Sequence, residues 1–339
     1  MAGLKYSYQP NDFGVGVIQE TTVGTAVANT VQLFTDSVSL PSFSPVQDLA
    51  PKSGEFVSRD ETIYSTAKAT PSEVTVSGLL NDTALGLLEG IFHTAAGSNV
   101  ITVTDAYTAP ALPDGHTTTA ATRTYTVKIL APQTENDDAS SQVDQTIVLP
   151  GCSVTAFSVS GDASGDGRLT YSATFKTGYT PLFNQAAGST SASAETGIRN
   201  IHDLTYRTIA GISEPVMQSF TLSVENPAEY IGWDPANNKP YSIARSVPEG
   251  PVVTLSSVIK LDQHTNSLLG NFMNASAQTG LTNHLSNHDG KAAALTSATE
   301  FAFNCDKAII TGMSLNEQAA MMYSIDQKLL FGSFTIRNS

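Results

Sequence analysis

Several segments of this chain alternate between apolar and polar residues, and this pattern constrains the fold more than any other feature. In the segment 169–176 every second residue is apolar, beginning with Leu169. The same two-residue period runs through 123–129 and 220–225. Because successive side chains of a β-strand point to opposite faces, this period predicts half-buried strands in antiparallel sheets.

The composition agrees with a mostly β fold. Charged residues make up 14% of the 339 residues, whereas Thr and Ser number 40 and 36. A typical soluble domain is about one quarter charged. Threonine is β-branched and suits a pleated, half-buried surface. The length suffices for two ordinary domains, each with its own core.

Two helices are predicted to interrupt the strands, each beginning at an aspartate. Asp82 precedes apolar residues spaced along one helical face as far as Phe92, and Asp262 precedes a similar set that ends at Met273. An aspartate in this position accepts hydrogen bonds from N–H groups of the first turn. We therefore expect each aspartate to cap a helix.

The two aspartates also mark an internal repeat. At an offset of 180 residues, four of eleven positions from each aspartate onward are identical. The identical pairs are Asp82/Asp262, Leu88/Leu268, Gly90/Gly270 and Phe92/Phe272. A strand-like segment precedes both sites, and the shared order of strand and helix favours a diverged duplication.

A segment of small polar residues separates the two copies. Residues 184–198 lack periodicity and have the composition of a flexible linker. We therefore expect a first β domain at 1–183, a linker at 184–198 and a second β domain at 199–339. Two further segments, 94–121 and 131–145, are expected to form long loops.

The charge of the chain argues against nucleic-acid binding through phosphate contacts. Lys and Arg number 17 against 31 Asp and Glu, a net charge of −14. Residues 1–182 contribute 8 − 18 = −10 and residues 183–339 contribute 9 − 13 = −4, so both halves are acidic. Phosphate contacts need a basic surface. The sequence contains no stretch of 18 apolar residues, so we expect no membrane-spanning helix. The first residues lack the apolar core of a secretory signal.

Signatures of catalysis are absent or broken. The sequence contains no G-x-S-x-G and no phosphate-binding G-x-x-x-x-G-K-[ST] motif. Gly14 and Gly16 begin a dinucleotide-binding pattern, but Gln19 stands where the third glycine belongs. We expect no enzymatic activity and no catalytic, cofactor-binding or metal-binding residues.

One segment imitates the start of a calcium-binding loop. Asp162, Ser164 and Asp166 supply oxygen atoms at positions one, three and five, and Gly167 follows at position six. Position twelve is Ala173, where a bidentate glutamate is needed, and it lies within a predicted strand. A hairpin turn is the favoured interpretation, and a weak calcium site is the alternative.

Other residues that could bind a metal or act as a nucleophile are isolated in the sequence. His284 and His288 have the spacing of helical zinc ligands, but the Asn and Gly residues around them favour a loop with surface histidines. Cys152 and Cys305 do not form a C-x-x-C pair and are expected to be buried core residues at equivalent positions. Trp233 is expected to anchor a turn, and an exposed binding residue is the alternative.

The opening of the chain resembles a protein family. Residues 13–27 carry Gly14, Gly16, Glu20, Thr21, Gly24, Thr25 and Ala26. This pattern resembles the start of major tail tube proteins of long-tailed, siphovirus-like bacteriophages, of the two-domain, duplicated type. The departures are a longer spacing between Gly16 and Glu20 and a valine at position 23, where an aromatic residue is common in the family. Segments 151–173 and 219–226 resemble the closing hairpin of the family's first half and the strand that opens its second half.

The resemblance implies both a fold and a role. It implies two tandem β-sandwich or β-barrel tail-tube domains, each with one flanking α-helix. It also implies a structural virion protein that assembles with itself into trimeric pseudo-hexameric or hexameric rings, which stack into a hollow conduit for genome delivery. The implied location is the virion tail, assembled in the host cytoplasm.

The resemblance further implies several partners and no cofactor. The implied partners are tail tip or baseplate proteins, a tail terminator, a tape measure protein, and DNA that passes through the lumen without specific binding; no membrane is implied. We expect part of the negative charge to face the lumen and repel phosphates.

Two other classes of function stay open from the sequence. Another ring-forming tail component would use the same domain and differ in forming a single ring. Acidic, Thr-rich tandem β-sandwiches are also common in bacterial cell-surface adhesion modules, and such a module would stay monomeric and bind a glycan or receptor.

Overall fold

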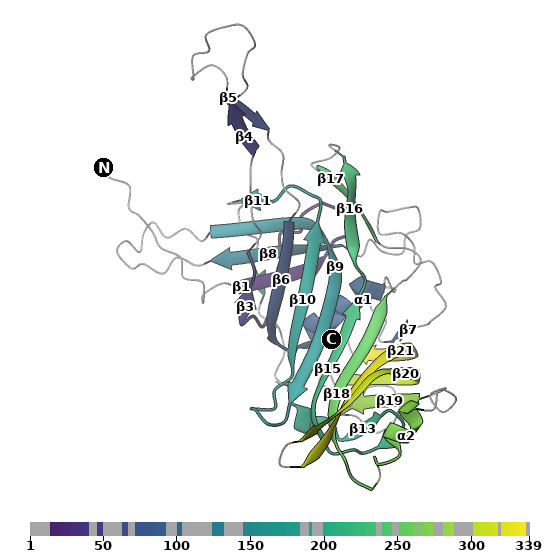
Figure 1. The fold of residues 1–339 in the computed structure, drawn as a ribbon. Coiled ribbons are helices and arrows are strands. Elements are labelled where there is room, and N and C mark those ends of the chain that lie inside the picture. Colours follow the sequence, from purple (N-terminus) through teal and green to yellow (C-terminus); the bar gives the residue numbers. More distant parts are fainter. Residues whose placement is uncertain are drawn as a thin grey trace.

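A computed structural model describes most of the chain. The described ranges are 14–40, 46–49, 63–66, 72–92, 100–103, 124–131, 145–183, 190–191, 199–234, 239–245, 251–263, 265–273, 281–287, 301–317 and 320–336. They form mainly antiparallel strands with two short α-helices, so the mostly β fold expected from the sequence is confirmed (Figure 1).

Strands follow one another along the chain with few helices between them. The part up to residue 183 contains β1 (Gly14–Gln19), β2 (Thr30–Leu33), β3 (Ser37–Val38), β4 (Val46–Leu49), β5 (Ile63–Thr66), β6 (Ser72–Leu79), α1 (Asp82–Phe92), β7 (Val100–Val103), β8 (Tyr125–Ala131), β9 (Gln145–Asp162), β10 (Thr170–Thr177) and β11 (Leu182–Phe183). The part from residue 190 contains β12 (Thr190–Ser191), the 3₁₀ helix η2 (Ile201–Asp203), β13 (Tyr206–Ile209), β14 (Ile212–Ser213), β15 (Met217–Glu225), β16 (Ala228–Trp233), β17 (Tyr241–Arg245), β18 (Val252–Lys260), α2 (Leu268–Met273), β19 (Leu281–Ser286), β20 (Phe301–Glu317) and β21 (Met321–Ile336).

Antiparallel pairing runs without interruption through most of the strands. The order is β3–β6–β10–β9–β15–β18–β21–β20–β19–β13–β14. The first part of β9 also belongs to a second layer, ordered β2–β1–β8–β9–β11. In Figure 1, β1 and β8 run across the direction of β6 and β10, so the two layers cross like those of a sandwich.

The same order of elements occurs twice along the chain. β3, β6, α1, β8, β9 and β10 in the first set correspond to β15, β18, α2, β19, β20 and β21 in the second. In each set the strand before the helix pairs with the last strand, which pairs with the strand preceding it. A separate hairpin, β4–β5 or β16–β17, lies between the first two strands of each set. The domain boundaries at 183 and 199 stay a prediction, because pairing between β9 and β15 joins the sets without a break.

The core consists of the apolar faces of these strands together with α1. Val74, Val76, Tyr171 and Phe175 are buried between the layers, and Leu222 and Leu255 continue the same core into the second set. The alternation predicted for 169–176 and 220–225 is confirmed by the burial of every second residue. β8 differs from the expected half-buried strand. Thr126 and Lys128 on its polar face are buried too, because that face is covered by other parts of the chain.

The helix caps differ from those expected. The Asn81 side chain, not Asp82, accepts the N–H of Ala84 at 2.8 Å and caps α1. Asparagine is as good a cap as aspartate, and it stands one residue earlier. α2 begins six residues after Asp262, which instead closes the preceding turn by exchanging hydrogen bonds with Thr265.

Two of the three expected irregular segments contain strands. β7 lies within 94–121 and pairs with β21, and β12 lies within 184–198 and pairs in parallel with β2. The ends of 131–145 belong to β8 and β9. The other residues of these segments lie outside the described ranges.

Candidate assembly interface

The two sets of strands are joined edge to edge by β9 and β15. The residues from Ala156 to Asp162 pair with Glu225 to Ser219, and Thr221 lies directly opposite Ser160. This contact is head-to-tail, because an edge late in the first set meets the first strand of the second set. Such a contact uses two different surfaces and leaves one copy of each surface free at the outer ends of the pair.

Side chains from the second set strengthen this junction. The Asn226 amide, buried just after β15, donates a hydrogen bond of 2.9 Å to the carbonyl oxygen of Ile91 near the end of α1. The Lys176 ammonium donates to the carbonyl oxygen of Ala228 at 2.8 Å and lies 4.4 Å from the centre of the Tyr230 ring. A cation above an aromatic face is attracted by the ring quadrupole. These contacts tie β10 and α1 to the strands that follow β15.

A buried ion pair adds a further link between the sets. The Arg199 guanidinium pairs with the carboxylate of Asp82 at the start of α1, and both side chains are almost fully buried. The backbone of Arg199 also accepts the N–H of Leu169 at 2.8 Å. Burial makes such a pair costly to break from one side. The segment that leads from the first set to the second is therefore fixed against the first set.

Each outer end of the joined sets presents an open strand edge. Among the described residues, β3 pairs only with β6, and β20 from Ile309 onward pairs only with β21. Their counterparts β15 and β9 pair on both sides. The open edge of β3 in the first set therefore corresponds to the edge of β15 that pairs with β9. The open edge of β20 in the second set corresponds to the edge of β9 that pairs with β15.

The positions on the two open edges can be matched in register. Ser37 corresponds to Thr221, because Ser37 pairs with Ser77 in β6 and Thr221 pairs with Ser256 in β18. Ser314 corresponds to Ser160, because Ser314 pairs with Ser324 in β21 and Ser160 pairs with Thr170 in β10. The internal junction places Thr221 opposite Ser160. A second copy placed by the same rule would bring its Ser37 opposite Ser314 of the first.

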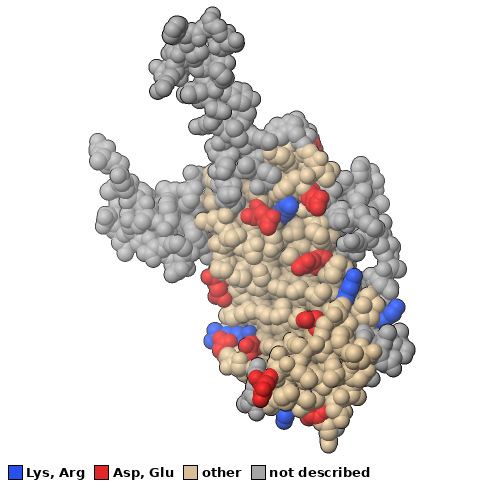
Figure 2. Space-filling model, viewed as in Figure 1, with Lys and Arg blue, Asp and Glu red and all other residues tan. Residues whose placement is uncertain are grey.

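The outer face of the continuous sheet is rich in hydroxyl groups. Charged side chains are scattered over the molecule in this view, with wide uncharged areas between them (Figure 2). The hydroxyl residues of this face are Thr75, Ser77, Ser158, Ser160, Thr170, Ser172, Thr174, Thr221, Ser223, Thr254, Ser256 and Ser324. Several are hydrogen-bonded across neighbouring strands, such as Thr75 with Thr174 at 3.1 Å. On β6, β9, β10, β15, β18 and β21, as far as their side chains are described, this face carries four acids and three lysines. They are Glu73, Asp162, Glu225, Asp326, Lys176, Lys260 and Lys328.

The glutamate of the opening motif is a structural residue. Glu20 is 2% exposed, and its carboxylate accepts the N–H of Gly24 and of Gly151, both at 2.8 Å. It also accepts the hydroxyl groups of Thr124 at 2.8 Å and Thr126 at 2.9 Å. These bonds satisfy a buried charge and tie the loop after β1 to β8 and β9.

The glycine of the same motif makes room for an aromatic ring. Gly24 and Gly151 have φ values of 74° and 64°, in the left-handed region that favours glycine. A Cβ atom at either position would overlap the Tyr179 ring. Tyr179 is therefore enclosed by two glycines, and the motif residues act in packing.

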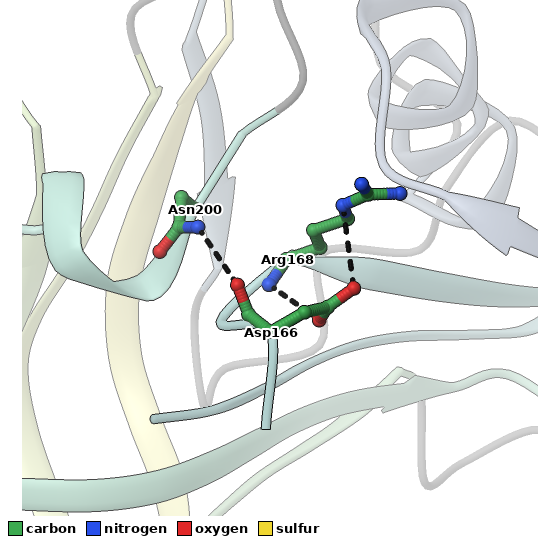
Figure 3. Close-up of polar contacts among 3 residues, drawn as sticks. All are labelled: Asp166, Arg168 and Asn200. Atoms are coloured by element: carbon green, nitrogen blue, oxygen red, sulfur yellow. Dashed lines mark hydrogen bonds and ion pairs between the residues drawn. The ribbon is translucent and has the colours of Figure 1, made fainter. Parts of the chain in front are cut away.

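The calcium-like segment forms the turn between β9 and β10, as favoured from the sequence. The Asp162 carboxylate accepts the N–H of Ser164 at 2.8 Å, and hydrogen bonds from the side chain and backbone of Ser164 lower the pKa of Asp162. Asp166 accepts the N–H of Arg168 at 3.1 Å and forms an ion pair with its side chain at 3.3 Å (Figure 3). Asn200 donates to the carbonyl oxygen of Asp166 at 3.2 Å. The carboxylates thus serve the turn itself.

The prediction of a surface loop was wrong for His284. This histidine lies within the strand β19, which pairs with β13 and β20 on its two edges, and its side chain is buried. His288 lies outside the described residues. Trp233 is the last residue of β16, opposite Tyr241 of β17, and the connection that follows it includes residues 235–238, which lie outside the described ranges. A role of Trp233 in anchoring a turn stays a prediction.

Both cysteines are buried, as expected. Cys152 and Cys305 are each less than 2% exposed, and their thiols donate to the carbonyl oxygens of Leu149 and Lys307. Each lies in the strand before the last of its set, β9 or β20. Burial, followed by the nearby charge of Glu20, raises the pKa of the Cys152 thiol well above its ordinary value. A thiol in this state is a poor nucleophile at neutral pH.

The described residues hold no candidate for other kinds of site. Within these ranges, no group of three or more His, Cys, Asp or Glu side chains is placed to hold a metal ion. No helix in the same ranges has the length and hydropathy needed to cross a bilayer. Among the residues that form the junction, Arg199, Asn226 and Lys176 carry no local sequence signal, because their partners are distant along the chain.

Comparison with known proteins gave no assignment. Neither a scan of protein-family models nor a search of curated proteins produced a match to this chain.

Proposed function

We propose that this chain is a structural subunit of a bacteriophage tail tube, which assembles with further copies of itself into stacked rings that form a hollow conduit for the genome. The observation that carries the proposal is the head-to-tail junction between β9 and β15. Among the described residues, the same two kinds of edge are open at β3 and β20. Open edges of antiparallel sheets tend to pair with another chain.

Repetition of one head-to-tail contact leads to a closed assembly when its rotation closes. Each chain supplies two successive sets of strands, so three chains would give a ring of six similar sets. A hexamer of chains is the other arrangement that the resemblance implies. Contacts between stacked rings are again head-to-tail and do not close, which produces a tube.

The nearly neutral, hydroxyl-rich face of the sheet supports a conduit role. DNA is held by proteins chiefly through Lys and Arg contacts to phosphate. Three lysines offset by four acids over this broad face provide no net attraction. We propose this face as the lumen wall. The described side chains of this face carry one more acid than lysines, so low adhesion would come from near-neutrality more than from strong repulsion.

The remaining parts of the proposal rest on the sequence resemblance. They are location in the virion tail, contact with tail tip or baseplate, terminator and tape measure proteins, and a lack of enzymatic activity. A role as another ring-forming tail component predicts single rings, and a role as an adhesion module predicts a monomer.

The first test is size-exclusion chromatography with negative-stain electron microscopy of the purified chain. The proposal predicts rings and tubes whose abundance rises with protein concentration. Single rings that never stack would favour another tail component. A monomer at every concentration, also when tail tip proteins are added, would contradict the proposal.

The second test fixes the contact in register. Ser37→Cys combined with Ser314→Cys should give disulfide-linked oligomers on mild oxidation, because neighbouring antiparallel residues have Cα atoms about 4.5–5.5 Å apart. A ladder that ends at three chains identifies a trimeric ring, and one that ends at six identifies a hexamer. Each single variant and the pair Ser37→Cys with Ser324→Cys, which lies one strand further in, are the matched controls and should stop at a dimer or below. The native cysteines are buried.

A further inference from the structure

α1 is buried on nearly all sides, and both sets of strands contribute to its burial. It packs against β9 and β10 of its own set, against β2, and against β21 of the other set. In Figure 1 it lies behind the sheet, near the junction of the two sets. Asn226 reaches the last turn of α1 from the second set. Buried positions along α1 include Leu88, Glu89 and Ile91.

α2 occupies the same place in the second set but has less of this cover. It follows β18 as α1 follows β6, and it packs against β20 as α1 packs against β9. Leu268, the counterpart of Leu88, is buried. Leu269, the counterpart of the buried Glu89, is 40% exposed, and Met273 is 78% exposed. α2 thus presents apolar residues to solvent, and at the position of Leu269 the corresponding residue of α1 is buried.

A complementary apolar residue is exposed at the opposite end of the chain. Val38 in β3 corresponds to Leu222 in β15, because Val38 pairs with Val76 of β6 and Leu222 pairs with Leu255 of β18. Leu40, two residues after Val38, therefore corresponds to Val224. Val224 is 1% exposed at the junction of the two sets, whereas Leu40 is 47% exposed. The edge through which the second set joins the first, two residues before the Asn226 contact with α1, therefore has an exposed counterpart at β3.

We infer that the face of α2 formed by Leu269 and Met273 is covered by the β3 edge of a second copy of this chain, at the end marked by Leu40. The inference rests on the proposed function and identifies the part of the partner copy that meets α2. The internal contact around α1 is its template. Burial of apolar surface on both partners supplies affinity, and pairing of β3 with β20 supplies the register.

The test uses Leu269→Lys combined with Met273→Lys. Both side chains are exposed in the single chain, so the monomer should fold with an unchanged melting temperature. Loss of two buried apolar contacts should raise the concentration needed for assembly at least about tenfold. Ile231→Lys, which replaces an apolar residue 65% exposed on β16, is the matched control and should leave assembly unchanged.

The outcomes separate the inference from the proposed function. Assembly of the double-lysine variant at the wild-type concentration overturns the inference and leaves the tube proposal intact. Failure of the wild-type chain to assemble, with no Ser37–Ser314 cross-link in the cysteine variant, overturns both. If the double-lysine variant does not fold, hydrogen exchange of the wild-type chain decides. Slower exchange of peptides covering 268–273 on assembly supports the inference, and unchanged exchange overturns it.

Discussion

The Asn226 side chain donates a buried hydrogen bond of 2.9 Å to the carbonyl oxygen of Ile91, across 135 positions of sequence. Ile91 lies in the last turn of α1, where carbonyl groups lack helical partners. Asn226 begins the connection from β15 to β16. One amide thus couples the end of the first set's helix to the strand through which the second set joins it.

Asn226→Ala should destabilise the whole chain. The substitution leaves a buried carbonyl without this donor, and such a loss costs about 1–3 kcal/mol. Urea denaturation followed by circular dichroism measures the change. Ser256→Ala, which removes an exposed hydrogen bond to Asp326, should stay within about 0.5 kcal/mol of wild type. Equal effects of the two variants would contradict the role of Asn226.

Glu20→Gln should destabilise the fold strongly, although the two side chains are similar in size. The carboxylate accepts four hydrogen bonds, and an amide nitrogen placed among those donors accepts none. We expect a loss of about 2–4 kcal/mol in the free energy of unfolding. Glu225→Gln, at an exposed position, is the control. A thermal melt of Glu20→Gln that matches wild type would show that the buried carboxylate is dispensable.

Gly24→Ala and Gly151→Ala should each destabilise the fold for two reasons. A non-glycine residue in the left-handed region costs about 1–2 kcal/mol, and overlap with the Tyr179 ring adds about 1–3 kcal/mol. Urea denaturation measures the sum. Gly14→Ala, where a Cβ atom meets nothing within 4 Å, is the control.

Combining either alanine with Tyr179→Ala separates the two terms. The double variant should recover the overlap term and keep the backbone term. Strict additivity of the single effects would mean that the ring does not contact these glycines.

Stability should fall in alkaline solution. Burial raises the pKa values of Tyr171, Tyr179 and Tyr230, and burial with the charge of Glu20 raises that of Cys152. Above about pH 9 the unfolded chain therefore loses protons that the folded chain keeps, and the free energy of unfolding decreases with pH. Lys128 acts in the opposite sense, because burial lowers its pKa. Below the ordinary lysine pKa the folded chain loses this proton before the unfolded chain does, which partly offsets the decline.

Urea titrations from pH 7 to pH 11 measure this dependence. Tyr230→Phe should flatten the decline by removing one of the four groups, while a surface variant such as Glu225→Gln should leave it unchanged. Stability that stays constant or rises up to pH 11 would contradict the expected burial of these phenols and of the thiol.

Local sequence patterns predicted the strands in which buried and exposed side chains alternate. The alternation in 170–176 determined both the strand β10 and the face it buries, since every second side chain of a strand points the same way. The glycines and glutamate after β1 form a motif in the sequence, but their structural role became visible only with Tyr179 and Gly151 in place. Asn and Gly residues around His284 suggested a loop, because turn propensity is local and pairing with β13 and β20 is not.

Local sequence patterns are enough to predict a mostly β chain with a repeated strand–helix unit, because side-chain periodicity acts over a few neighbouring positions. Which strands find partners on both edges becomes visible only in the folded chain. β9 and β15 are paired on both sides, whereas β3 and the end of β20 are each paired on one side among the described residues. Edge pairing depends on strands far apart in the chain, and no local pattern encodes which of two similar edges is left open.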